Sequence, residues 1–319
     1  MRCDACGSPG GDALFEGGDR RFGLPGRFSV VRCPRCLLVR TEPQPDDLGV
    51  HYPSDDYYSF ARPEPPKERV RERVRAAYDS NGSAARARQR LAAAGRDRLM
   101  PGMPPGPPGD ILDVGCGSGS FLLALREAGW RPHGIELSDR AVAAAHEAGL
   151  DTVRRGDLLD ADYRAQSFDV VRFWHSLEHM RSPRAQLTEA LRLLRPGGRL
   201  TVGVPNFGSL ISRSAGERWY YLDLPRHLWH FEAGTLARLV ARCGFLDPHV
   251  RQVSGGIPLL GTLDYLRGRR ERLVKKRWAW YAALPAAALL DRAGVGDALT
   301  LTASAPAAER SPAGALHAG

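Results

Sequence analysis

Ile111-Leu-Asp-Val-Gly-Cys-Gly-Ser-Gly-Ser-Phe121 is the stretch of sequence that decides the fold. It predicts a buried strand that runs into a glycine turn, followed by an amphipathic helix that starts at Ser120. Glycines at alternate positions of the turn let the backbone approach a ligand where a Cβ atom would collide. A dinucleotide-binding fingerprint needs a further glycine at position 120, where this chain has Ser120. The Gly-x-Gly-x-Gly spacing therefore predicts a nucleotide-like ligand at the end of a strand.

Strands and helices are expected to alternate on both sides of this turn. The predicted strands cover 110–115, 132–136, 151–154, 168–174, 199–204 and 246–253, and the predicted helices cover 119–129, 139–148, 183–194 and 233–243. A last alternating run at 297–304 predicts a closing strand. This order predicts an α/β fold with a doubly wound, mostly parallel seven-stranded sheet of Rossmann-like type.

Acidic residues follow the glycine turn at the positions that a nucleoside pocket needs. Glu136 ends the next strand, where its carboxylate can accept hydrogen bonds from both ribose hydroxyls. Asp157, followed by Leu158, comes after the third strand, where a carboxylate would meet an adenine amino group. Each residue also has a purely structural interpretation, because Glu136 could cap a helix and Asp157 could form a turn.

Together with the Arg195-Pro-Gly-Gly198 turn before the fifth strand, these elements resemble the class I S-adenosylmethionine-dependent methyltransferases, over about 110–255 and 297–304. The resemblance implies that Asp113 orients the methionine amino group, that Glu136 holds the ribose and that Asp157 with Leu158 holds the adenine. It also implies that the turn passes beneath the cofactor. The remaining cofactor-binding candidates are Gly115, Cys116, Gly117, Gly119 and Trp174.

In such an enzyme the sulfonium already carries an activated methyl group, so the protein has mainly to align an acceptor and remove a proton. His175, Glu178 and His179 follow the fourth strand, at the sheet edge where ligands bind. One interpretation makes His175 or His179 a general base. A second makes the three a divalent metal site, similar to positions in some catechol-like O-methyltransferases of quinone synthesis. A third is packing beside the cofactor and helix capping.

The segment from Arg218 to Phe231 is a second candidate region, because it is dense in aromatic, His and Arg residues and should cover the acceptor site. His227 is the preferred general base, with Arg226 available for an anionic or sugar substrate. His230 is expected to be structural. The alternative is a packed aromatic loop that holds the following helix.

Two Cys-x-x-Cys pairs, Cys3 with Cys6 and Cys33 with Cys36, predict a structural, tetrahedral zinc site without an open position. Redox chemistry and unliganded thiols are the alternatives. The surrounding residues Asp19–Cys36 and Tyr52–Tyr58 resemble the N-terminal part of bacterial zinc-ribbon methyltransferases of the methyltransferase-23 type. That resemblance implies one enzyme, with a small-molecule or glycan acceptor from envelope polysaccharide or secondary metabolism, and leaves O- and C-transfer open.

The chain is expected to divide into a zinc ribbon at 1–45, a connecting region with helices at 46–109, a methyltransferase domain at 110–304 and a disordered tail at 305–319. A helical insertion at 256–295 precedes the last strand. Within it, 265–290 places Arg and Lys before Trp and Tyr residues, as in a helix that lies on a membrane surface. A helical hairpin packed on the domain is the preferred interpretation.

The net charge of +9 and the pI of about 9.6 favour acidic partners, although Arg far outnumbers Lys, as a biased genome would produce. The chain shows no secretory signal and no membrane span, so a cytoplasmic location is expected. An RNA methyltransferase that grips RNA with the ribbon is an alternative, as are a non-catalytic cofactor-binding adaptor and a nicotinamide oxidoreductase. Nucleic acid is disfavoured because the fourth strand ends in Trp174-His-Ser-Leu instead of Asn/Asp-Pro-Pro-aromatic. The oligomeric state is open.

Overall fold

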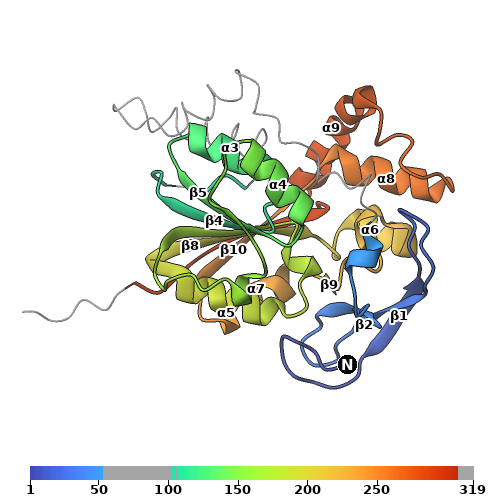
Figure 1. Cartoon of the computed structure of the whole chain (residues 1–319). Coiled ribbons are helices and arrows are strands. Elements are labelled where there is room, and N and C mark those ends of the chain that lie inside the picture. Colours follow the sequence, from blue (N-terminus) through green and yellow to red (C-terminus); the bar gives the residue numbers. More distant parts are fainter. Residues whose placement is uncertain (53–101, 105, 308–319) are drawn as a thin grey trace, which may run out of the picture.

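The computed structural model describes residues 1–52, 102–104 and 106–307; the helices expected within 67–100 and the tail from 308 lie outside these residues (Figure 1). Seven strands form the central sheet in the order β10-β11-β8-β7-β4-β5-β6. Their bounds are β4 Asp110–Val114, β5 Arg131–Glu136, β6 Val153–Arg155, β7 Phe168–Trp174, β8 Leu194–Pro205, β10 Leu246–Val253 and β11 Ala298–Ser304. Neighbouring strands pair in parallel from β8 to β6, and β11 runs antiparallel to both β8 and β10. The predicted doubly wound, mostly parallel sheet is confirmed.

Helices cover both faces of this sheet, as the alternating sequence pattern requires. Helices α3 (Ser120–Glu127) and α4 (Asp139–Glu147) pack on one face through a cluster that includes Leu122 and Leu125. Helices α5 (Pro183–Leu193) and α7 (Ala233–Arg242) lie on the other face in Figure 1. The central strands are buried on both sides, which explains their continuous apolar runs.

One strand boundary differs clearly from the predicted one. Strand β8 begins at Leu194, directly after α5, whereas the sequence pattern placed its start at 199. Leu194 pairs with Phe168, and the register then shifts so that Arg199 pairs with Val170. The predicted turn at 195–198 is therefore an irregularity within the strand, with Gly197 at a φ of 73°.

A second, four-stranded sheet has the order β1-β2-β3-β9, with antiparallel pairs throughout. Strands β1 (Asp12–Gly17), β2 (Phe28–Arg32) and β3 (Val39–Glu42) come from the N-terminal segment, and β9 (Trp229–His230) comes from the segment before α7. Phe28, Val30 and Val39 share a buried cluster with Trp219 and Leu222. The N-terminal segment, too poor in apolar residues for its own core, thus shares one with the rest of the chain.

Among the described residues, the remaining α-helices lie between β8 and β11 in sequence. Helix α6 (Leu210–Ala215) and the short 3-10 helices η5 (Gly216–Arg218) and η6 (Tyr220–Leu222) lead toward β9. Helices α8 (Gly256–Leu266) and α9 (Arg277–Arg292) pack against each other as a hairpin, and α8 also contacts η6. Among the described residues, no helix combines the length and apolarity needed to cross a bilayer.

Candidate functional site

The glycine turn follows β4 at the carboxyl edge of the sheet. Gly115, Gly117 and Gly119 have φ values of 76°, 56° and 83°, a region that favours glycine. A Cβ atom on Gly115 would lie 2.6 Å from Cβ of Ser176, and one on Gly119 would overlap Leu150. The backbone conformation therefore favours glycine at all three positions, and close packing also requires it at Gly115 and Gly119. Gly115 itself is exposed to solvent.

Glu136 lies beside this turn, at the end of β5. One carboxylate oxygen accepts the Gly117 N–H at 2.9 Å, and the other accepts the Ser138 N–H at 3.0 Å. Ser138, not Glu136, caps α4, because its side chain accepts from the backbone N–H of Ala141. The helix-cap interpretation of Glu136 is therefore wrong. Each oxygen keeps a lone pair for a further hydrogen bond.

Asp113 is buried and engaged by a residue that the sequence analysis did not single out. Arg172 Nη1 donates to both carboxylate oxygens of Asp113 at 2.8 Å, and the guanidinium lies over the rings of Phe121 and Trp174. Burial raises the pKa of Asp113, while the Arg172 charge opposes that shift. A charged residue in the apolar run of β7 was the available sequence signal for this pair.

The other cofactor-binding candidates lie around the same edge. Asp157 accepts from the Leu159 N–H at 2.9 Å and from Gln186 at 2.8 Å, which makes it the N-cap of the 3-10 helix Leu158–Asp160. Leu158 is buried. The Cys116 thiol packs on Gly134, where burial raises its pKa well above the usual value. The half-buried ring of Trp174 lies against Gly203.

The structure brings both candidate clusters together. His175, Glu178 and His179 follow β7, the last two within the 3-10 helix η4 (Leu177–His179), and His227 approaches them from the segment before β9. His175 Nδ1 lies 3.4 Å and His227 Nε2 lies 4.0 Å from Oε1 of Glu178. Glu178 is fully buried, and within the described part of the chain neither of its carboxylate oxygens has a hydrogen-bond partner.

Hydrogen bonds fix which nitrogen of each imidazole points into this cluster. His227 Nδ1 lies 2.8 Å from the Tyr221 carbonyl oxygen, so it carries the proton and leaves a lone pair on Nε2. His179 Nδ1 contacts the Arg226 carbonyl at 3.0 Å and the Tyr52 hydroxyl at 2.8 Å, which leaves its own Nε2 open. Burial, aided by the neighbouring His179, lowers the pKa of His227 to about 4, so this imidazole is neutral.

The donor atoms of Glu178, His179 and His227 lie within 4.8 Å of one another, close enough to share one metal ion. His175 adopts a φ of 51°, an uncommon backbone conformation for a residue with a side chain. Such conformations often occur at functional sites. The cluster can therefore accept a proton or bind a cation.

The side chains of Arg226 and His230 are hydrogen-bonded outside this cluster. The fully buried Arg226 guanidinium donates to Asp19 at 2.8 Å and to Asp223 at 2.7 Å, and it also donates to the His51 carbonyl. The predicted role of Arg226 in binding an anionic substrate is wrong, because two carboxylates already occupy its donors. His230 belongs to β9, and its Nε2 lies 3.0 Å from the Thr41 hydroxyl, in agreement with its expected structural role.

Comparison with known proteins shows the family to which this architecture belongs. A family described as methyltransferase domain matches residues 84–248, just over half of the 319 residues. The chain belongs to this family. The match covers the whole glycine turn, Glu136, Asp157 and the cluster that follows β7, so the seven-stranded sheet with its helices is a methyltransferase domain.

Similar proteins include ubiquinone biosynthesis O-methyltransferase of Idiomarina loihiensis, which is 33% identical over 28% of this chain and 40% of its own. The 27-O-demethylrifamycin SV methyltransferase of Amycolatopsis mediterranei is 37% identical over 34% of this chain and 42% of its own. The chain thus spans about two fifths of the length of these relatives. Among solved structures, a SAM-dependent methyltransferase of Thermotoga maritima has a TM-score of 0.47 at 20% identity, covering 75% of this chain and 94% of its own.

Four cysteines gather at the N-terminal end of the methyltransferase chain. The sulfur atoms of Cys3, Cys6, Cys33 and Cys36 all lie within 4.8 Å of one another, with Cys3 3.4 Å from Cys36 and Cys6 3.5 Å from Cys33. Disulfide bonds need about 2.05 Å, and zinc–sulfur bonds of about 2.3 Å place tetrahedral sulfurs about 3.8 Å apart. The four thiols therefore fit a tetrahedral metal ion.

Both Cys-x-x-Cys pairs adopt the same local backbone. The Gly7 N–H donates to the Cys3 carbonyl at 2.8 Å, and the Leu37 N–H donates to the Cys33 carbonyl at 3.0 Å. Gly7 and Leu37 have φ values of 71° and 68°, so each pair ends in a left-handed residue. Burial raises the pKa of the Cys33 thiol, but hydrogen bonds from backbone N–H groups outweigh it and lower that pKa to about 7. Burial raises the pKa of Cys3 and that of Cys36. The matching backbone turns direct the four sulfur atoms toward one point.

The cysteine cluster is docked on the methyltransferase domain. Asp4 accepts from the Ser182 hydroxyl at 2.6 Å and from the Arg184 N–H at 2.7 Å, both at the start of α5. Cys3, Cys33 and Leu38 belong to the same hydrophobic core as the central sheet. The N-terminal segment is thus packed into the domain.

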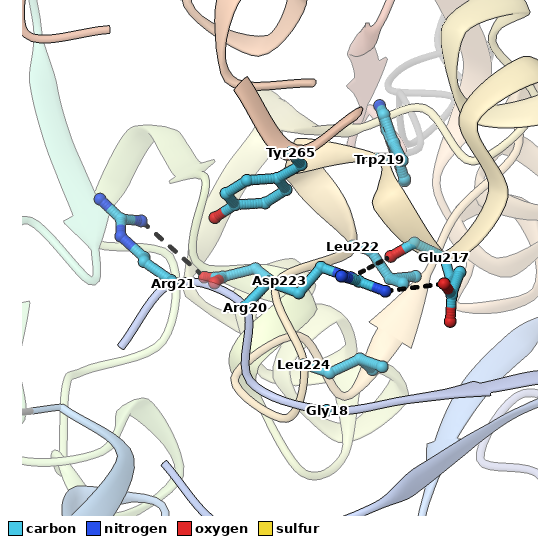
Figure 2. Close-up of a pocket in the computed structure, with 9 residues that line it drawn as sticks. All are labelled: Gly18, Arg20, Arg21, Glu217, Trp219, Leu222, Asp223, Leu224 and Tyr265. Carbon is cyan, nitrogen blue, oxygen red and sulfur yellow. Dashed lines mark hydrogen bonds and ion pairs between the residues drawn. The ribbon is translucent and has the colours of Figure 1, made fainter. Parts of the chain in front are cut away.

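A small hollow lies where the N-terminal segment meets the segment from Glu217 to Leu224, and Figure 2 shows the side chains that line it. Arg20 donates to the Glu217 carboxylate at 2.7 Å, and Arg21 lies 4.0 Å from Asp223. Because these charges are paired with one another and the glycine turn does not line the hollow, it joins two segments and is not the candidate active site.

Proposed function

We propose that the whole chain is an enzyme that transfers the methyl group of S-adenosylmethionine to a hydroxyl of a small hydroxylated or sugar-like acceptor. One observation carries this proposal: Ser176 joins the glycine turn to the cluster around Glu178. Its hydroxyl donates to the Val114 carbonyl at 2.6 Å, and its Cβ lies against Gly115. A cofactor held at the turn would therefore lie beside a neutral imidazole and a buried carboxylate.

In this proposal the cofactor lies across the exposed Gly115, with the turn Gly115–Gly119 beneath it. The free lone pairs of Glu136 accept the two ribose hydroxyls, and the Arg172-paired Asp113 sets the charge near the methionine amino group. Leu137 and Leu159 are 66% and 48% exposed on either side of the edge, and the adenine ring would cover them. Neither leucine stood out in the sequence.

The proposed chemical step needs one proton acceptor. The acceptor oxygen attacks the sulfonium methyl, the carbon–sulfur bond breaks to give S-adenosylhomocysteine, and the hydroxyl proton passes to Nε2 of His227. Glu178 and Asp223 lie 4.0 and 3.9 Å from that nitrogen and would stabilise the imidazolium as it forms. His175 would position Glu178, and His179 would position the segment that carries Arg226 and His227.

A divalent cation held by Glu178, His179 and His227 is a second candidate for this role. It is favoured by the two unpartnered oxygens of the buried Glu178 and by the low pKa of His227, because a metal ligand must be unprotonated. A bound cation would lower the pKa of an acceptor hydroxyl. Dialysis against EDTA, restoration of stoichiometric zinc at the four cysteines and then titration with Mg²⁺ or Mn²⁺ separate the two, since a histidine base needs no divalent cation beyond that zinc.

The names of the two relatives support transfer to oxygen, because each names an O-methyl acceptor position or an O-methyltransferase. We further propose that Cys3, Cys6, Cys33 and Cys36 hold a structural zinc ion, since four thiolates leave no open position for catalysis. RNA is the alternative acceptor, and a non-catalytic adaptor is the alternative function.

Mass spectrometry after incubation with S-adenosylmethionine bearing a deuterated methyl group tests the proposal. The acceptors offered are sugar nucleotides, polyhydroxylated aromatic metabolites and bulk RNA, with His227→Ala and His179→Ala as variants. We expect label on a hydroxyl of a small acceptor, lost in His227→Ala without loss of cofactor binding. Label found in RNA alone, or full turnover by His227→Ala, would contradict the proposal.

A further inference from the structure

Helix α9 buries its small side chains and exposes its large ones. The buried residues are Ala279, Ala283 and Ala287, which are spaced four residues apart and form one stripe. Trp278, Tyr281 and Leu289 are 64%, 66% and 63% exposed. An ordinary surface helix of a globular domain has the opposite arrangement, so this helix needs another explanation.

The exposed large residues share one face. At about 100° per residue, Trp278, Tyr281 and Leu289 lie within a sector opposite the alanine stripe, together with Pro285. Trp280 and Leu284, 39% and 45% exposed, widen this sector on one side. The helix therefore presents a continuous aromatic and aliphatic face to its surroundings, which we call the α9 face.

A strongly basic connector leads into this face. Residues 267–277 contain seven Arg and Lys residues and one acidic residue, Glu271. Glu271 accepts from the Tyr220 hydroxyl at 2.7 Å and lies 3.3 Å from Arg21, so its charge is turned toward the protein. The exposed cations of the connector are Arg267, Arg269, Arg270, Arg272, Lys275 and Lys276.

We propose that the α9 face and the basic connector together form a docking surface for an anionic lipid bilayer. Trp and Tyr favour the interface between headgroups and acyl chains, and Lys and Arg are attracted by anionic headgroups. The helix would lie in the plane of the interface, consistent with the finding that no described helix can span a bilayer. A second copy of the chain fits less well, because a two-fold contact would bring two basic connectors together.

The hairpin is connected to the segment that leads to His227. Two residues of α8, Gly261 and Thr262, contact Tyr220. The Tyr220 N–H donates to the Thr262 hydroxyl at 3.1 Å, and the Tyr220 ring packs on Gly261. Docking through α9 therefore places the segment that leads to His227 near the membrane surface.

Co-sedimentation of the full chain with vesicles tests the docking surface, without any assay of turnover. Vesicles of phosphatidylcholine with phosphatidylglycerol are compared with vesicles of phosphatidylcholine alone. We expect the wild type to sediment with the anionic vesicles, and to be released by high salt. Wild-type protein that stays in the supernatant with anionic vesicles at low salt overturns the proposal.

Two sets of variants locate the contact. Trp278→Ala with Tyr281→Ala and Leu289→Ala should lower partitioning by at least about tenfold, and the matched control changes three exposed leucines elsewhere, Leu14→Ala, Leu210→Ala and Leu246→Ala. Lys275→Glu with Lys276→Glu should lower partitioning onto the anionic vesicles by about fivefold or more per residue. The charge-matched control is Arg164→Glu with Arg213→Glu, both exposed and outside the hairpin.

Circular dichroism and S-adenosylmethionine binding show whether each variant is folded. If both hairpin sets sediment like their controls, the docking surface is wrong. A dimer in light scattering that the aromatic variants convert to a monomer also overturns the proposal, because it assigns the α9 face to a second copy of the chain.

Discussion

The two halves of the candidate site are built over very different distances along the chain. In the cofactor half, Glu136 is hydrogen-bonded to Gly117, 19 positions away, and to Ser138, two positions away. In the acceptor half, Arg226 is paired with Asp19, 207 positions away, and the Thr41 hydroxyl donates to the His227 carbonyl, 186 positions away. Within the cofactor half, the contact of Asp113 with Arg172 spans 59 positions. The acceptor half instead joins the N-terminal segment to residues 175–230.

This difference changes the expected role of the cysteine cluster. Strand β3 follows Cys33 and Cys36 directly, and it pairs with β9, which follows His227 by one residue. The Tyr52 hydroxyl reaches His179 from the same N-terminal segment. The N-terminal segment therefore supports the acceptor half of the site, and we expect its loss to affect the cofactor half less.

Removal of zinc from the four cysteines should have the largest effect, because we expect it to lower turnover while leaving cofactor affinity nearly unchanged. We expect Cys33→Ser with Cys36→Ser to abolish zinc binding and to lower turnover by at least about a hundredfold, because β3 no longer positions the loop around His227. The dissociation constant for S-adenosylmethionine should change by less than about threefold. Metal analysis, a turnover assay and cofactor titration measure these effects.

The control for this variant is Cys243→Ser, at the end of α7 and outside the cluster, which should retain zinc and activity. Undiminished zinc in the double variant would refute the metal assignment. Equal losses of cofactor binding and turnover would show that the N-terminal segment supports the entire fold.

Arg226→Ala should have the next largest effect. It leaves the buried carboxylates of Asp19 and Asp223 without their cation, which costs about 3–5 kcal/mol of unfolding free energy. The matched variant is Arg131→Ala, at the start of β5, which removes an exposed guanidinium that donates twice to Asp110. Denaturant unfolding should show a clear loss for Arg226→Ala and almost none for Arg131→Ala. Similar losses would show that the buried Arg226 pairs stabilise the fold no more than a surface ion pair does.

Acid should destabilise the acceptor half before the cofactor half. Burial lowers the pKa of His227 to about 4 and that of His230 to about 3, both below the unfolded value of 6.5. The unfolded chain therefore binds more protons below pH 6.5, and stability is lost as the pH falls toward these values, by about 3 kcal/mol for His227 and about 5 kcal/mol for His230. His227→Gln should reduce the slope of unfolding free energy against pH by about one proton between pH 6 and 5. An unchanged slope would contradict a neutral, buried His227.

The sequence predicted the sheet and the cofactor half well, because strand periodicity and the glycine turn are local properties. It also placed Glu136 beside the turn and grouped the four cysteines. It did not predict that β9 joins the N-terminal sheet, since a two-residue strand has no periodicity of its own. It assigned Arg226 to a substrate because a lone Arg in an aromatic segment gives no sign of a partner such as Asp19.

The cluster around Glu178 was predicted only in parts. His175, Glu178 and His179 formed one candidate group and His227 another, and only the folded chain shows that they share one carboxylate. Arg172 and the exposed Leu137 and Leu159 were missed, because an isolated charge in a strand and single exposed leucines are common features of any domain.

Calorimetric titration of S-adenosylmethionine into Glu136→Ala and His227→Ala tests the division of the site most directly. Loss of the Glu136 carboxylate removes two charge-assisted hydrogen bonds to the cofactor, so the dissociation constant should rise by at least about tenfold. His227→Ala should bind the cofactor within about twofold of the wild type while losing turnover. Wild-type affinity in Glu136→Ala, or lost affinity in His227→Ala, would contradict a cofactor site at the glycine turn with a separate acceptor site.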